Sequence, residues 1–211
     1  MVAPQWRVWS YEQPALVLGC SQRAWHERLS AAPAGLPMEV LLRESGGGAV
    51  LTGPWLLGLS LVLPPGHAWL AGGLLPSYQR LGELHVEALE ALGISARAVA
   101  PQALGADKSK READPLGWAC FGSLSPWEVV DAQGRKLVGL AQRRRQTGVL
   151  LVAGTLLSPP DWPLLCAAMD RPQDAAVLRE RTVSCAQLQG RPLAAQTWST
   201  ILLRRLAQAL R

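Results

Sequence analysis

Hydrophobic and polar residues alternate in short blocks along most of this chain, with glycine, proline and small polar residues between the blocks. Short runs rich in valine, leucine and aromatic residues, bounded by such turn residues, are typical of β-strands. They predict strands within 7–19, with a break at Gln13-Pro14, at 38–42, within 49–63, with a break at Gly53-Pro54, and at 118–121, 127–130, 136–143 and 149–157. Turns at 123–126, 133–134 and 147–148 connect the later strands into a meander.

A second pattern, with apolar residues every three or four positions, predicts helices at 24–29, 75–92, 161–169 and 193–210. The helix at 75–92 is followed by Gly93 at the position of a C-cap, and Asp161 is placed as an N-cap. The segments 31–37 and 105–115 have the composition of loops. Because strands come in blocks with helices between them, the pattern predicts a single α+β domain over 1–211.

Composition agrees with a globular protein, since 49% of the 211 residues are hydrophobic and 18% are charged. The sequence has no apolar stretch long enough to predict a membrane span. Residues Met1 to Trp9 lack the pattern of a signal peptide, so we expect a cytoplasmic protein. With three histidines and no closely spaced cysteines, neither a structural metal nor disulfides are expected. The cysteines are Cys20, Cys120, Cys166 and Cys185.

The formal net charge is +5, and the lysines are Lys108, Lys110 and Lys136. The one dense basic run, at 143–145, is typical of a solvated strand end or loop. Without interleaved aromatic residues or a binding motif it does not favour nucleic acid as a partner.

Three consecutive glycines stand between two predicted strands in the segment 43–50. Glycines permit positive φ and let successive N–H groups point into a concavity that suits an anion. A tight hairpin needs the same residues, so both interpretations stay open. The segment does not have the Walker pattern, because no Gly-Lys-Ser/Thr follows.

Lys136 stands at the start of a predicted strand, after the turn at Gly134, with the small residues Gly139 and Ala141 beside it. A lysine in this position could neutralise a carboxylate or phosphate, or donate to a developing oxyanion. The alternative is a solvent-facing hairpin lysine. Glu128 is placed on the exposed face of its strand.

These segments, with a strand at 14–22 that ends in glycine, two residues and Gln22, resemble the lipoate–protein ligase and octanoyltransferase family, relatives of biotin–protein ligase. The resemblance covers about 7–170, and 171–211 is a helical extension. It implies a catalytic domain with a mixed or antiparallel sheet flanked by helices and an acyl chain in a tunnel beside the sheet. It implies that Lys136 contacts the acyl carbonyl or acyl phosphate. It places around the substrate Arg43, Ser45, Gly46, Gly47, Gly48, Ala49, Val50, Gly139 and Ala141.

Cys120 lies between alanine and phenylalanine, where a strand cysteine is ordinarily a core residue. The cysteine-dependent transferases of this family carry a cysteine followed by phenylalanine upstream of the lysine motif. The resemblance to this branch implies that Cys120 takes an octanoyl or lipoyl group as a thioester and passes it to a lysine of a lipoyl domain. Lys136 is then the cation that favours the thiolate. Acyl carrier protein or lipoyl domains are the expected partners, without a tightly bound cofactor.

Two alternatives stay open. An ATP-dependent lipoate–protein ligase would use ATP and Mg²⁺ and no cysteine, and a non-catalytic module would only bind lipoyl or biotinyl domains. Residues 161–211 offer room for a helix or two, which favours the transferase over ligases with an accessory domain. Relatives commonly carry a helix before the first strand, and a histidine where this chain has Thr52.

Overall fold

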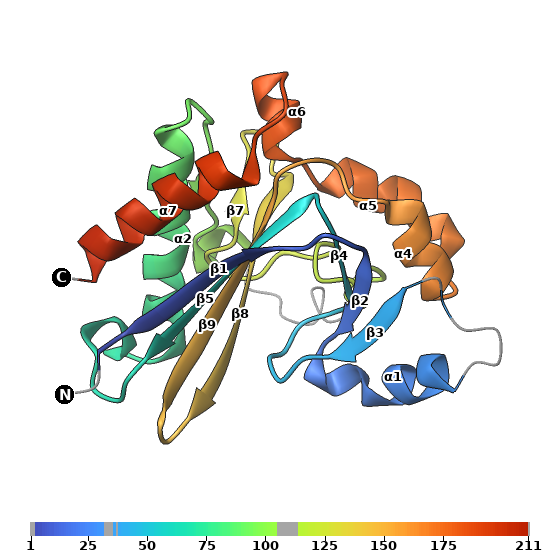
Figure 1. Cartoon of the computed structure of the whole chain (residues 1–211), viewed down its shortest axis with the longest axis horizontal. Coiled ribbons are helices and arrows are strands. Elements are labelled where there is room, and N and C mark those ends of the chain that lie inside the picture. Colours follow the sequence, from blue (N-terminus) through green and yellow to red (C-terminus); the bar gives the residue numbers. More distant parts are fainter. Residues whose placement is uncertain (1–2, 32–35, 37, 105–113, 211) are drawn as a thin grey trace.

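The computed structural model describes residues 3–31, 36, 38–104 and 114–210. Its centre is a six-stranded sheet in the order β1-β5-β9-β8-β7-β6, in which neighbouring strands are antiparallel (Figure 1). The bounds are β1 Gln5–Ser10, β5 Leu56–Leu63, β6 Arg97–Ala98, β7 Val129–Val130, β8 Lys136–Arg145 and β9 Gly148–Leu156. The predicted meander is confirmed for its last three strands, because β7, β8 and β9 are neighbours in chain order.

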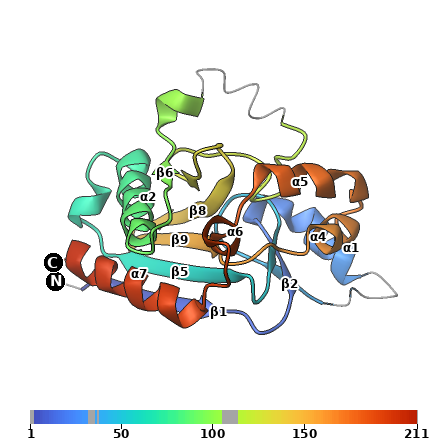
Figure 2. The same ribbon diagram turned by 90° about the horizontal axis from the view of Figure 1, so that it is seen from above.

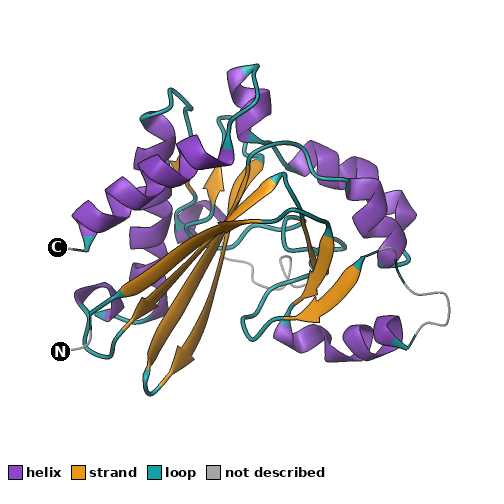
Figure 3. Ribbon diagram, viewed as in Figure 1, coloured by secondary structure: helices purple, strands orange, loops and turns teal. Residues whose placement is uncertain are grey.

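A smaller sheet lies beside the large one, on the face that helices α2 (Leu74–Glu90) and α7 (Ala195–Ala209) do not cover (Figure 3). It has the order β3-β2-β4, with β2 parallel to β3 and antiparallel to β4. Its strands are β2 Ala15–Leu18, β3 Glu39–Leu42 and β4 Val50–Thr52, and helix α1, Arg23–Ser30, packs against it. The break at Gly53-Pro54 therefore separates strands of two different sheets.

Helices α2 and α7 cover the other face of the large sheet, while α4 and α5 lie on the side of the small sheet (Figure 2). The helices are α2 Leu74–Glu90, α4 Trp162–Ala168, α5 Ala175–Arg181, α6 Cys185–Gln189 and α7 Ala195–Ala209. The covered face carries leucines of β5 at alternate positions, and α7 contributes Trp198, Leu202 and Leu206, which are fully buried. One hydrophobic core therefore joins sheet and helices into a single α+β domain, as predicted.

Most predicted elements are confirmed, including the Asp161 cap, whose carboxylate accepts the N–H of Leu164. The strand at 118–121 is wrong, because residues 116–122 bond to one another locally as turns. Residues 161–210 hold four α-helices instead of one or two, since α5 and α6 were missed. The loop predictions at 31–37 and 105–115 fall mainly outside the described residues. Within the described part, no helix has the length and apolar character needed to cross a membrane.

Candidate active site

Cys120 lies on a turn between β6 and β7 of the large sheet, and this turn bonds to the residue before β4 of the small sheet. Its N–H donates to the carbonyl of Ala49 at 2.8 Å, and the N–H of Ala49 donates to the carbonyl of Trp118 at 2.7 Å. This close approach requires Gly48, because a Cβ there would overlap the carbonyl of Trp118. One of the three consecutive glycines thus serves the packing of the glycine loop, residues 43–50, against the Cys120 turn.

Gln22 fixes the same turn from the small sheet. Its amide oxygen accepts the N–H of Gly19 at 3.1 Å, and its amide nitrogen donates to the carbonyl of Trp118 at 2.9 Å. The glutamine that ends the 14–22 motif therefore connects that motif directly to the segment carrying Cys120.

Arg43 organises the glycine loop from within. Its guanidinium donates to the carbonyls of Gly46 and Gly48 at 3.0 and 2.7 Å, and to that of Val17 at 3.2 Å. Charged donors of this kind are stronger than neutral ones. Arg43 was predicted to bind substrate, and in the structure its guanidinium stabilises the conformation of the glycine loop.

An apolar cavity of about 340 Å³ lies between the two sheets, with Cys120 and Phe121 in its wall. The large sheet contributes mainly small residues, and the small sheet and its loop form the opposite wall. Of the predicted substrate residues, the cavity is lined by Arg43, Ser45, Val50, Gly139 and Ala141. Trp9 and Tyr11 also line it and were not predicted from the sequence to bind substrate; Thr52, noted for its departure from the family pattern, lines it too.

A second, polar cavity of about 280 Å³ also borders Cys120. Gly47 and Gly48 of the glycine loop line this cavity and not the apolar one, among the residues described. Its polar side chains are Ser21, Gln22, Ser123, Ser125 and Glu128. Cys120 is half-buried and borders both cavities, so this residue lies where an apolar chain and a polar group could meet. Gly46 and the buried Ala49 line neither cavity in the described structure.

Lys136 is buried, with 2% of its surface exposed, which excludes the solvent-facing alternative. Its amine donates to the carbonyl of Cys120 at 2.6 Å and to that of Ser123 at 3.0 Å. The third partner is the carboxylate of Glu128 at 2.7 Å. These contacts use all three N–H donors of the ammonium group. The amine therefore grips the backbone of the Cys120 turn, and Lys136 is not among the described residues that line the apolar cavity.

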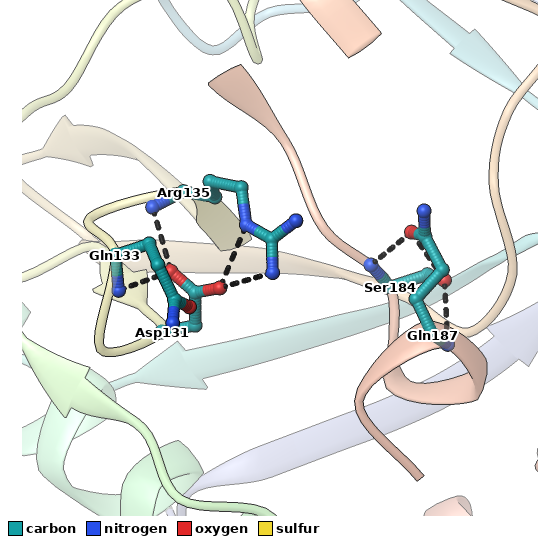
Figure 4. A network of polar contacts seen from close by, with 5 residues as sticks. All are labelled: Asp131, Gln133, Arg135, Ser184 and Gln187. Atoms are coloured by element: carbon teal, nitrogen blue, oxygen red, sulfur yellow. Dashed lines mark hydrogen bonds and ion pairs between the residues drawn. The ribbon is translucent and has the colours of Figure 1, made fainter. Parts of the chain in front are cut away.

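The turn before Lys136 is held by a polar network (Figure 4). The buried carboxylate of Asp131 accepts the N–H groups of Gln133 and Arg135 and pairs with the Arg135 guanidinium at 2.7 Å. From the other side, the N–H of Val183 donates to the carbonyl of Lys136 at 3.0 Å. The position of Lys136 at the start of β8 is fixed by these contacts as well as by its own side chain.

Glu128 is buried, with 2% exposed, and the prediction that it faces solvent is wrong. Glu128 directly precedes β7 and follows Trp127, whose positive φ of 68° interrupts the regular alternation of side chains between the two faces of a strand. Burial raises the pKa of Glu128, and the ion pair with Lys136 together with the N–H groups of Ser125 and Leu140 acts in the opposite direction. The carboxylate and the ammonium satisfy each other inside the protein, which is the condition for keeping such charges buried.

The remaining cysteines differ in burial. Cys166 and Cys185 are fully buried, and burial raises the pKa of their thiols to about 11 and about 12. Cys20 is exposed. His85 is buried in α2, and no group of three or more potential metal ligands occurs among the described residues.

The basic run at 143–145 is the exposed end of β8, as predicted. Arg145 pairs with Glu44 at 2.8 Å, and Arg143 donates to the carbonyl of Glu44 at 2.8 Å. The run therefore ties the β8–β9 hairpin to the glycine loop beside the apolar cavity.

The family profile described as lipoyl protein ligase A/B catalytic domain matches residues 2–207. The chain belongs to this family. Octanoyltransferase LipM of Kyrpidia tusciae is 33% identical over 99% of this chain and 76% of the relative, and octanoyltransferase LipM of Symbiobacterium thermophilum is 32% identical over 91% and 69%. The resemblance drawn from the motifs is confirmed, and the match extends past residue 170 into α7.

Solved structures of the family share the fold. A lipoate protein ligase of Thermoplasma acidophilum aligns with a TM-score of 0.66 at 18% identity, over 98% of this chain and 71% of the other. Biotin protein ligase of Aquifex aeolicus, in complex with biotin and ATP, aligns with a TM-score of 0.53 at 16% identity, over 96% and 68%. At these identities the likeness shows the architecture alone.

Thr52, where relatives commonly have histidine, is buried and donates to the carbonyl of Ala15 at 3.1 Å.

Proposed function

We propose that this protein moves an octanoyl group from an acyl carrier protein to a lysine of a lipoyl domain, with Cys120 carrying the group as a thioester in between. Relatives named octanoyltransferase LipM support the reaction. The observation that carries the proposal is the place of Cys120, in the wall of both the apolar and the polar cavity. A thioester on this sulfur would have its alkyl chain on one side and its second substrate on the other.

The apolar cavity suits a small chain-like ligand. Its volume of about 340 Å³ is near the lower end of the range for small-molecule pockets, roughly 300–1,000 Å³. Burying the seven carbons beyond the carbonyl of an octanoyl group contributes about 6 kcal/mol at about 0.8 kcal/mol each. This binding energy is available to hold the acyl group at the sulfur.

The reaction balances without a further reactant. The Cys120 thiolate attacks the carbonyl of the octanoyl thioester, a new C–S bond forms, and the carrier thiol leaves and takes up a proton. The amine of the lipoyl-domain lysine then attacks the Cys120 thioester. A C–N bond forms, the bond to Cys120 breaks, and the proton released by the amine restores the thiol. No ATP is consumed.

Lys136 acts on this chemistry through the turn that it holds. Its amine donates to the carbonyl of Cys120 itself, so it fixes the backbone of the residue that carries the nucleophile. Glu128 keeps the amine in this place, and the pair works as a positioning device for Cys120.

A transfer assay tests the proposal. Wild-type protein, octanoyl-carrier protein and a lipoyl domain are mixed without ATP, and octanoylation of the lipoyl domain is followed by intact mass. We expect transfer by the wild type and by Cys20→Ser, a control at an exposed thiol, and none by Cys120→Ser. Transfer by Cys120→Ser at the wild-type rate would overturn the cysteine mechanism.

Two other outcomes would replace the proposal. Formation of lipoyl-AMP from lipoate and ATP, retained in Cys120→Ser and lost in Lys136→Ala, would identify a ligase. Binding of a lipoyl domain without turnover of any acyl donor would identify a binding module.

A further inference from the structure

Three glycines form a row across the large sheet, on the face that lines the apolar cavity. Gly58 of β5 pairs with Gly154 of β9, which pairs with Gly139 of β8. None of the three has a positive φ, so their backbone conformation does not demand glycine. What they provide is space, because the missing side chains lower the sheet surface along one line. The row makes a furrow across three adjacent strands.

One end of this furrow lies at the nucleophile. A Cβ on Gly139 would be 3.4 Å from Lys136 Cε and 3.6 Å from the ring of Phe121, the residue after Cys120. Towards the β8–β9 hairpin tip, by contrast, Leu150 and Val152 carry side chains into the cavity. The glycine row therefore leaves a path across the strands that no side chain of the row itself obstructs.

The other end is closed by Trp9. This residue of β1 pairs with Gly58, and its indole occupies the place where a Gly58 side chain would be, since a Cβ there would overlap the indole Nε1. The indole Nε1 donates to the hydroxyl of Tyr11 at 2.5 Å, and both rings line the cavity. Trp9 is thus fixed as a wall at the edge strand of the sheet.

The length of the furrow fits a medium chain. Two strand spacings separate Gly139 from Gly58, about 10 Å at roughly 4.8 Å each, and the Trp9 indole over Gly58 leaves somewhat less than this length free. An extended chain advances roughly 3.3–3.6 Å per three bonds, so the seven carbon–carbon bonds of an octanoyl group span about 8 Å. A dodecanoyl chain, with eleven such bonds, spans about 13 Å and would run into Trp9.

We propose that Trp9, seated on Gly58 and held by Tyr11, determines the length of the acyl chain that this protein accepts. The proposal rests on the proposed function, because it assigns the alkyl chain of the Cys120 thioester to the glycine furrow. Removing the indole opens the furrow towards β1 for longer chains. Leu56 narrows the furrow at Gly154, because a Cβ there would be 3.3 Å from the Leu56 side chain, and a methyl group added at Gly154 narrows it further.

The test measures loading of Cys120 by intact mass, with hexanoyl-, octanoyl-, decanoyl- and dodecanoyl-carrier protein in pairwise competition. We expect the wild type to prefer octanoyl over the two longer chains. Trp9→Ala should raise the decanoyl-to-octanoyl ratio by about 15-fold, the worth of two further buried methylenes. Gly154→Ala should shift loading towards hexanoyl. The matched control is Trp6→Ala, which changes an exposed tryptophan of the same strand outside the cavity lining.

The outcomes separate this inference from the function on which it rests. If the wild type loads octanoyl but Trp9→Ala and Gly154→Ala keep the wild-type chain-length profile, the assignment of Trp9 is wrong and the transferase function stands. If the wild type loads no acyl chain on Cys120, both fail. Should Trp9→Ala not fold, Trp9→Leu together with Gly154→Ala decides, because the second variant leaves Trp9 in place.

Discussion

Replacing Lys136 by methionine tests how the Cys120 turn is held together. The change keeps the length and much of the volume of the side chain and removes its charge. It leaves the Glu128 carboxylate without its counterion at a position 2% exposed, and the carbonyls of Cys120 and Ser123 without their donor. Removing one partner of a buried ion pair costs about 3–5 kcal/mol in the free energy of unfolding.

For a domain of this size, roughly 2–4 °C are lost per kcal/mol, so the midpoint of thermal unfolding should fall by about 6–20 °C. Circular dichroism during heating measures the shift. Glu128→Gln/Lys136→Met, which removes both charges, should be more stable than the sum of the two single changes predicts, by about 0.5–3 kcal/mol. Arg145→Met, which removes an exposed pair with Glu44, is the control and should cost less than about 1 kcal/mol. If the two single changes each lowered the free energy of unfolding by less than about 1 kcal/mol and their effects were additive, Glu128 and Lys136 would not form a buried ion pair.

Two further predictions concern buried titratable groups. Burial lowers the pKa of His85 from 6.5 to about 4, so the folded protein resists its protonation. The free energy of unfolding should fall by roughly 3 kcal/mol as the pH falls through this window, and His85→Gln should flatten that part of the pH profile measured by urea unfolding. An alkylating reagent at about pH 8 should label Cys20 and Cys120 in the folded protein but Cys166 and Cys185 only after unfolding, as peptide mapping would show. Labelling of Cys166 or Cys185 in the folded protein would contradict the burial of these two thiols.

The parts of the fold that follow from the sequence are those determined by local pattern. The alternation in 136–157 and the helical repeat in 75–92 each reflect one element against one core face, and both were predicted correctly. The short helices α5 and α6 were missed because they are too brief to show a repeat. A signal was present for α6, since Ser184 and Gln187 stand at capping-box spacing and form that box.

The site was predictable only where a motif identified it. Glu128 was assigned to the surface because a regular strand would place it on the face opposite Val129. The positive φ of Trp127, which the sequence does not reveal, breaks that regular alternation of faces. Its pairing with Lys136 had a signal, because opposite charges on either side of a hairpin turn are candidates for a cross-strand pair. Trp9 could not have been found in this way, since the face of β1 that lines the cavity is set by packing between two sheets.

The central claim is that Cys120 carries the acyl group, and the most direct measurement is to isolate that intermediate. Wild-type protein is incubated with octanoyl-carrier protein in the absence of a lipoyl domain, digested, and mapped by mass spectrometry with and without hydroxylamine, which cleaves thioesters. We expect an octanoyl group on the Cys120 peptide that hydroxylamine removes and that a lipoyl domain discharges. An unmodified Cys120 under conditions in which the same preparation octanoylates a lipoyl domain would contradict it.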